Sequence, residues 1–143
     1  MASQIDDLVK MQDSETLYDL MWDRVGIIRD EAGLRSAAAE LSALEAELDT
    51  CRLPDADRAF NLSWHDWMNL KSLIQVSRVI AEAAITRRDS RGAHFRSDHS
   101  ETGPLEQSTF TSARLEDDRP RITMKPVAFT RVRPGETLIR EAA

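Results

Sequence analysis

Residues 34–51, LRSAAAELSALEAELDTC, carry the periodicity that decides the fold. Leu34, Leu41 and Leu48 are seven residues apart, and each is followed three positions later by another small or apolar residue. This second series consists of Ala37, Leu44 and Cys51. Such spacing places both series on one face of an α-helix. The repeat lasts under three heptads, which favours a short helix of a bundle over a free coiled coil.

The chain before this stretch predicts an earlier helix. Ser14 is followed by an acidic residue and is typical of a helix N-cap. The apolar residues that then recur at helical spacing are Leu17, Met21, Val25 and Ile28, flanked by Leu20 and Ile27. Gly33 is expected to end this helix, because glycine readily adopts the left-handed conformation found just past a helix C-terminus.

The chain after this stretch predicts a third helix. Ser63 and Asp66 resemble a capping box at its start. One apolar or small face then follows at helical spacing, made of Trp67, Leu70, Ile74, Ser77, Ala81 and Ala84. Three apolar residues widen this face, namely Leu73, Val76 and Ile80. We therefore expect the third helix to be the most buried of the three and to end near residues 87–89.

Three amphipathic helices with short connections predict a mainly α fold, an up-down-up three-helix bundle over residues 14–100. Residues 1–13 are polar and are expected to form a flexible segment. Residues 108–115 are rich in β-formers, and residues 121–127 alternate apolar and polar after a turn, which predicts a β-hairpin. Because an isolated hairpin is marginal in water, residues 101–143 are expected to pack on the bundle or on a partner.

The composition excludes several classes of protein. The chain has 143 residues, with 19 Lys and Arg against 25 Asp and Glu, a formal net charge of −6. This negative charge, without aromatic residues interleaved among the arginines, argues against nucleic-acid binding. No glycine-rich loop of the phosphate-binding kinds occurs in the sequence.

Cysteine usage and hydropathy indicate a cytoplasmic protein. Cys51 is the only cysteine, so no internal disulfide can form and a reducing compartment is expected. The N-terminus lacks the apolar core of a signal peptide. The longest charge-free stretch of the helical part, residues 72–77, is too short to cross a membrane, so no direct membrane insertion is expected.

Few residues suggest catalysis or metal binding. The spacing of His94 and His99 around Asp98 matches no metal-ligand motif. Ser90, His94 and Asp98 are the residue types of a hydrolase catalytic triad, but the sequence around Ser90 does not predict the strand–turn–helix elbow that holds such a serine. We therefore expect no catalytic, cofactor-binding or metal site in this chain.

The segment at the end of the third helix is unusual. Four arginines surround a glycine there, at positions 87, 88, 91 and 96. Favourable interaction with the helix dipole accounts for Arg87 and Arg88 but not for those further on. Gly92 allows a sharp turn, and Arg91 and Arg96 offer planar forks that suit carboxylates.

Residues 89–98, DSRGAHFRSD, resemble the Glu-Ser-Arg-Gly-Ala-His-x-Arg-x-Asp segment of succinate dehydrogenase and fumarate reductase flavoprotein subunits. Residues 21–29, MWDRVGIIR, resemble a helix of L-aspartate oxidase, from the same superfamily, and residues 69–76, NLKSLIQV, resemble the helix between the two. Residues 122–127 are similar to a late strand of these proteins. The resemblance covers roughly residues 14–130 and concerns the C-terminal helical domain alone, a spectrin-like three-helix bundle.

The resemblance implies a supporting role rather than a catalytic one. The FAD-binding and cap domains of the family have no counterpart in this sequence. We expect a small helical subunit that completes a split FAD-dependent oxidoreductase of the succinate dehydrogenase, fumarate reductase and L-aspartate oxidase type, acting on a dicarboxylate-like substrate. FAD is expected in a larger flavoprotein partner chain. The expected interface residues are Ser90, Arg91, Gly92, His94, Arg96 and Arg29.

Other interpretations remain open at this point. Arg91 could tie its own helix end to the hairpin instead of contacting a partner. The chain could be a non-catalytic helical interaction module that forms a homo-oligomer. Alternatively, it could be a segment of a full-length flavoprotein. The start of the sequence, Met1-Ala2-Ser3, favours a natural beginning over a cut segment.

Overall fold

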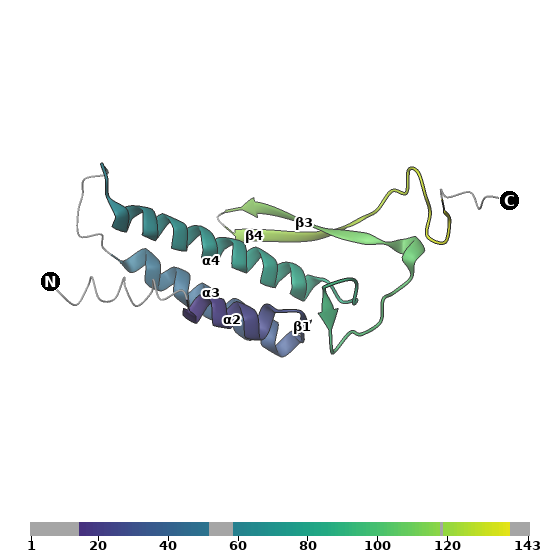
Figure 1. The fold of residues 1–143 in the computed structure, drawn as a ribbon, viewed down its shortest axis with the longest axis horizontal. Coiled ribbons are helices and arrows are strands. Elements are labelled where there is room, and N and C mark those ends of the chain that lie inside the picture. The colour runs from purple at the N-terminus through teal and green to yellow at the C-terminus, as the bar shows by residue number, and fades with distance from the viewer. Residues whose placement is uncertain (1–14, 52–58, 118, 138–143) are drawn as a thin grey trace.

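A computed structural model describes residues 15–51, 59–117 and 119–137. Within these described residues, three helices are followed by a two-stranded hairpin (Figure 1). The helices are α2 (Glu15–Val25), α3 (Glu31–Thr50) and α4 (Leu62–Thr86). The expected flexible segment 1–13 and the expected cap at Ser14 lie outside the described residues.

The core lies where α2 and α3 meet one side of α4. α3 and α4 run along each other, and α2 packs on both (Figure 1). The buried apolar side chains are Leu17, Leu20, Val25, Leu34, Ala37, Leu41, Leu48, Leu70, Ile74, Ala81 and Ala84. The leucine series of α3 is thus buried as its spacing predicts, whereas Cys51 is only half-buried as the residue that follows the helix.

The boundary between the first two helices differs from the prediction. α2 already ends at Val25, so the prediction that the helix continues through Ile27 and Ile28 is wrong, and both side chains are exposed. Gly33 lies inside the first turn of α3, so its assignment as a helix end is wrong as well. Asp30 is the N-cap of α3, because its Oδ1 accepts a hydrogen bond from the Gly33 amide at 2.7 Å. Gly26 occupies the turn, where a β-carbon would collide with the Trp22 carbonyl.

α4 ends at Thr86, in agreement with the prediction, but begins earlier than expected. Asn61 caps it by accepting a hydrogen bond from the Trp64 amide at 2.9 Å, so Ser63 is a helical residue and not the cap. The expected wide buried face is also wrong. Leu73, Val76 and Ile80 are 41%, 57% and 43% exposed, because only the opposite stripe of α4 faces the other helices.

The tryptophans differ in exposure. The indole of Trp67 packs against the core and donates to the Leu48 carbonyl at 3.2 Å, whereas Trp22 is 80% exposed on α2. Trp64, near the start of α4, is half-buried. These side chains therefore divide between the core and the surface.

The predicted hairpin is present and lies along α4 on the side away from α3 (Figure 1). Its strands, β3 (Thr109–Glu116) and β4 (Arg119–Pro126), are antiparallel. A short 3₁₀ turn, η1 (Leu105–Gln107), precedes them. Contact with α4 supplies the packing surface that an isolated hairpin lacks.

A second, smaller strand pair was not predicted. β1 (Ile28–Arg29) lies in the α2–α3 connection and pairs in parallel with β2 (Phe95–Arg96) after α4. This pairing joins the arginine-rich turn to the α2–α3 connection. No helix in the described part of the chain is both long and apolar enough to cross a membrane.

Candidate partner interface

The turn after α4 is positioned by backbone hydrogen bonds to β1. The Phe95 amide donates to the Ile27 carbonyl at 3.3 Å, and the Ser97 amide donates to the Arg29 carbonyl at 2.8 Å. A tight turn precedes them, closed by paired backbone bonds between Arg91 and His94. Gly92 in this turn has φ +56°, a conformation that favours glycine.

Arg96 is the centre of this region and is completely buried. Its guanidinium donates to both carboxylate oxygens of Asp98 at 2.7 Å and to Glu31 Oε2 at 2.8 Å. It also donates to the Ala84 carbonyl at 2.8 Å, near the end of α4. One side chain therefore joins the last turn of α4, the first turn of α3 and the loop after β2.

The electrostatics of this cluster are those of a satisfied ion-pair network. Hydrogen bonds from Arg96 hold the pKa of the Asp98 carboxyl well below its usual value, and the same guanidinium lowers the pKa of Glu31, with Arg35 contributing. Bonding to Asp98 and Glu31 in turn raises the pKa of Arg96. All three groups are therefore charged at neutral pH.

Ser90 closes the loop from inside. Its buried hydroxyl donates to the His99 carbonyl at 2.8 Å and accepts from the Arg96 amide at 2.8 Å. Its own amide donates to the Glu101 carbonyl at 2.9 Å. The functional groups of Ser90 and Arg96 are thus engaged within this chain. Their expected role at a partner interface stays a prediction, and such a role would be indirect, through the shape of the turn that they hold.

Arg91 is engaged towards the hairpin. Its guanidinium pairs with Asp89 at 2.9 Å and donates to the Thr102 and Pro104 carbonyls and to Ser108 Oγ, at 2.8, 3.1 and 2.7 Å. These contacts match the alternative in which Arg91 ties its helix end to the hairpin. The side chain keeps 20% of its surface exposed.

Arg29 and His94 form a different kind of contact. Arg29 donates through NH1 to His94 Nδ1 at 2.6 Å and through Nε to the Val25 carbonyl at 3.0 Å. Burial lowers the pKa of the Arg29 guanidinium, and within the described ranges no carboxylate lies within 4.0 Å of it. Burial, then the charge of Arg29, lowers the pKa of His94, and the Arg87 carbonyl acts in the opposite direction.

Three apolar side chains lie exposed beside this pair. Ile27 and Ile28 are 66% and 70% exposed, and Phe95, the register partner of Ile28, is 39% exposed. Alternation along the short strands explains this, because Arg29 and Arg96 face inwards where their neighbours Ile28 and Phe95 face out. An exposed apolar group of this kind is typical of an interaction surface. We call Ile27, Ile28 and Phe95 the apolar edge.

Comparison with known proteins identifies the family. The model of the family described as "Fumarate reductase flavoprotein C-term" matches residues 14–139. The chain belongs to this family. The resemblance noted in the sequence is thereby confirmed for the C-terminal domain of this superfamily.

The relatives that this chain matches are longer proteins. The fumarate reductase flavoprotein subunit of Haemophilus influenzae is 31% identical over 118 residues, which are 82% of this chain and 20% of that protein. An L-aspartate oxidase of Rhodospirillum rubrum is 35% identical over 62% of this chain and 26% of its own. A quinol-fumarate reductase with menaquinol molecules superposes with a TM-score of 0.76 at 25% identity, over 89% of this chain and 22% of that chain.

The chain therefore spans about a fifth of the length of these flavoprotein relatives. The relatives are flavoproteins, so we tested whether this C-terminal domain itself fits FAD. Dinucleotides bind their pyrophosphate at an open helix N-terminus behind a glycine-rich turn. At α3, the amides of Glu31 and Gly33 are already bonded to Asp98 and Asp30, and Asn61 caps α4. These residues do not fit FAD.

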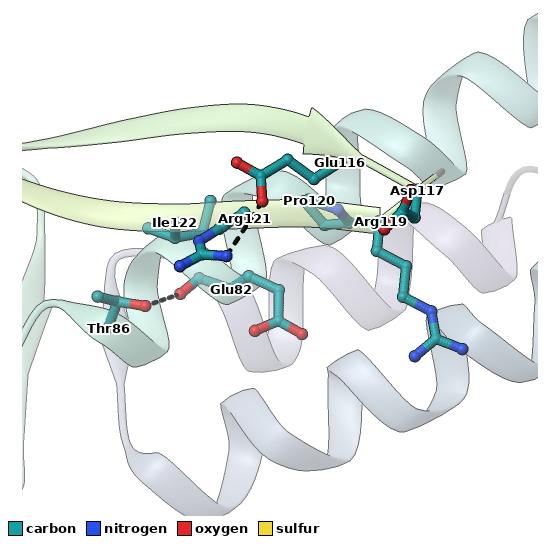
Figure 2. Close-up of a pocket in the computed structure, with 8 residues that line it drawn as sticks. All are labelled: Glu82, Thr86, Glu116, Asp117, Arg119, Pro120, Arg121 and Ile122. Carbon is teal, nitrogen blue, oxygen red and sulfur yellow. Dashed lines mark hydrogen bonds and ion pairs between the residues drawn. The ribbon is translucent and has the colours of Figure 1, made fainter.

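The described residues of the domain also offer no metal centre, since no group of three or more His, Cys, Asp or Glu among them is placed to hold an ion. A hollow of about 790 Å³ lies between α4 and the hairpin turn (Figure 2). Charges of both signs line it, and Arg121 pairs with Glu116 at 3.1 Å while the Thr86 hydroxyl donates to the Glu82 carbonyl. Its described lining residues include neither histidine nor cysteine.

The carboxylates of the Arg96 network are the residues that sequence reasoning missed. Glu31 is 65 positions from Arg96, and no local pattern links the two. Asp98 lies in the quoted motif, but in the sequence it was considered only as part of a metal motif or a catalytic triad. The signal for Glu31 was its place after the capping residue Asp30, because acidic residues favour the first turn of a helix.

Proposed function

We propose that this chain is the helical domain that completes a FAD-dependent oxidoreductase of the fumarate reductase, succinate dehydrogenase and L-aspartate oxidase type. The FAD-bearing part is carried by a separate, larger chain, against which this domain packs. The substrate of the assembly is a dicarboxylate, the class to which the fumarate and L-aspartate named for its relatives belong. This chain contributes a rigid wall and no reacting group.

The single observation that carries the proposal is that the exposed apolar edge lies on the turn that the Arg96 network holds in place. Arg96 fixes the turn by ion pairs to two separate elements, so its outer surface is preorganised. Ile27, Ile28 and Phe95 are exposed on that surface. A rigid surface with exposed apolar side chains loses little entropy on binding and gains from burial.

The same proposal includes the finer architecture. We take α2, α3 and α4 to form the up-down-up, spectrin-repeat-like bundle expected of the family, over residues 14–100. The hairpin then covers part of α4 and leaves the end with β1 and β2 open to the larger chain. The interface residues of this proposal are Arg29, Arg91, Gly92 and His94, together with the apolar edge.

Purification of the tagged chain from its native cells tests the proposal. We expect a yellow complex that contains one larger chain with bound FAD. Phe95→Asp should abolish its recovery, because an uncompensated carboxylate on the apolar edge would be desolvated on binding. Leu62→Asp is the matched control, since Leu62 is 75% exposed at the distant start of α4 and should retain the yellow complex.

A colourless chain recovered alone or only with copies of itself would contradict the proposal and would support the homo-oligomeric interaction module instead. Equal loss of the flavin-bearing partner in both variants would contradict the assignment of the interface to the apolar edge.

A further inference from the structure

A pocket of about 390 Å³ opens where the end of α4 meets β1 and β3. The charged or titratable side chains that line it are Arg29, Arg87, Arg91 and His94, and Ile80 and Thr111 form part of its wall. Its lining is thus cationic although the whole chain carries a formal charge of −6. We call it the cationic pocket.

The positive charge of the cationic pocket is not balanced by its surroundings. Asp89 pairs with both Arg87 and Arg91, at 2.8 and 2.9 Å. For Arg29, the described residues supply no carboxylate within ion-pair distance. Asp89 therefore serves two of the three guanidinium groups, and Arg29 has no ion-pair partner among the described residues.

Arg29 is held in place without being neutralised. Its Nε is bonded to backbone carbonyls and its NH1 to His94 Nδ1, whereas its NH2 makes no hydrogen bond to any described residue. Because the guanidinium donates to Nδ1, that nitrogen is an unprotonated acceptor. The His94 ring therefore accepts a hydrogen bond from Arg29 without neutralising its charge. The geometry preorganises one free arm of a cationic fork.

The position of the pocket indicates where the group that neutralises Arg29 must come from. Arg29 directly follows Ile28 of the apolar edge, on the same two-residue strand. Ile28 and Arg29 point to opposite faces of the strand. A partner large enough to cover both the edge and the mouth of the cationic pocket removes water from the Arg29 guanidinium, and an unpaired charge in such a place is strongly unfavourable. A partner that binds here must bring an anion of its own.

We infer that the cationic pocket binds a carboxylate side chain, from an Asp or Glu of the FAD-bearing chain, with Arg29 as its principal ligand. A planar carboxylate matches the guanidinium fork, and Arg91 lies in the same wall. This inference rests on the proposed function, because it names the group that the larger chain presents.

The first test needs no partner. The isotopically labelled chain is titrated with sodium acetate and, at equal ionic strength, with sodium chloride, and the resonances of the arginine Nε–H groups and of the His94 ring are followed by NMR. We expect saturable shifts with acetate at Arg29 and His94 and none at the exposed Arg121. Absence of saturation, or equal shifts at Arg121, would overturn the inference whether or not a flavoprotein partner exists.

The second test uses the complex. Arg29→Gln should weaken binding to the FAD-bearing chain at least about tenfold, as expected when one member of a desolvated charge pair is removed. Arg121→Gln, on the exposed hairpin, should leave it unchanged. Circular dichroism checks that both variants are folded, and the acetate titration of the wild-type chain stands independently of them.

The outcomes separate the two claims. If the wild-type chain does not recover a flavin-bearing partner, the proposed function fails. If it does, and Arg29→Gln binds equally well, this inference fails while the proposed function stands. Saturable acetate binding combined with an unaffected complex would mean that the pocket takes a free small carboxylate, which overturns its assignment to a partner side chain.

Discussion

Arg96 is the residue on which the end of the molecule depends. Its side chain is fully buried, and the carboxylates of Glu31 and Asp98 and the carbonyl of Ala84 take up its donors. Only a guanidinium can serve three acceptors in different directions from one plane, because the ammonium of lysine is a single point of charge. The Arg96 side chain therefore supplies both the positive charge that its two carboxylate partners need and the donor directions that reach all three acceptors.

Replacement of Arg96 by Lys should lower the free energy of unfolding by about 3 kcal/mol, the lower part of the range for disruption of a buried ion pair, since its partners keep some contact with water. Urea denaturation monitored by circular dichroism measures the change. Arg121→Lys, whose side chain is 67% exposed, is the matched control and should change stability by less than about 0.5 kcal/mol. A loss as small for Arg96→Lys as for the control would contradict the role assigned to the network.

The pH dependence of stability follows from Asp98. Its pKa in the native state is held below the value of about 3.9 found in an unfolded chain. On acidification below about pH 4 the unfolded chain therefore binds more protons than the native one, and the contribution of this carboxylate, complete above that pH, is progressively lost. Asp98→Asn should be less stable than wild type at pH 7 and should lose less stability between pH 5 and pH 2. Parallel curves for the two proteins would show that Asp98 is not the titrating group.

At the scale of the element, α4 shows how far periodicity determines burial. Apolar spacing predicted the helix, its end near residue 87 and its stripe from Leu70 to Ala84. It could not tell which flank of that stripe meets other elements. Leu73 and Ile74 are adjacent and similarly apolar, but Ile74 is 1% exposed and Leu73 is 41% exposed.

These two residues give a direct test of the packing of α4. Ile74→Ala should lower the free energy of unfolding by about 2–5 kcal/mol, because it leaves a cavity among buried side chains. Leu73→Ala, the neighbouring control on the same helix, should cost less than about 1 kcal/mol, since little area is buried there. Thermal denaturation of both variants decides the matter, and a reversed order would mean that the helix is rotated about its axis.

The helix boundaries show what local sequence leaves undetermined. Gly33 satisfies the rule for a helix end, but it tolerates the first turn of α3 because Asp30 caps its amide. The chain turns earlier, at Gly26, where contact with the Trp22 carbonyl excludes a side chain. Both glycines were available to the prediction, and only tertiary geometry decides between them.

At the scale of the whole molecule, the most distant pairings create the candidate interface. β1 and β2 are separated by more than sixty residues and meet only because α3 and α4 return the chain to the same end. The sequence marked Arg29, Arg91, His94 and Arg96 as a group through family resemblance. It did not predict that Arg96 and Ser90 face inwards or that Arg91 binds the hairpin segment. Nor did it predict that Arg29 finds no carboxylate within 4.0 Å among the residues that the structure describes.

These placements separate the residues that stabilise the turn from the residues that form its outer surface. Residues that are fully engaged within the chain hold the turn, and residues beside them present an apolar and cationic surface. This arrangement is the one that the proposed function requires, since the starts of α3 and α4 are already capped within the chain and do not offer a pyrophosphate site.

Native mass spectrometry of the complex from the original cells tests this account most directly. The account predicts one copy of this chain bound non-covalently to one larger chain that retains FAD. A species containing only this chain, as monomer or homo-oligomer, or a single polypeptide that carries this sequence and the FAD site together, would contradict it.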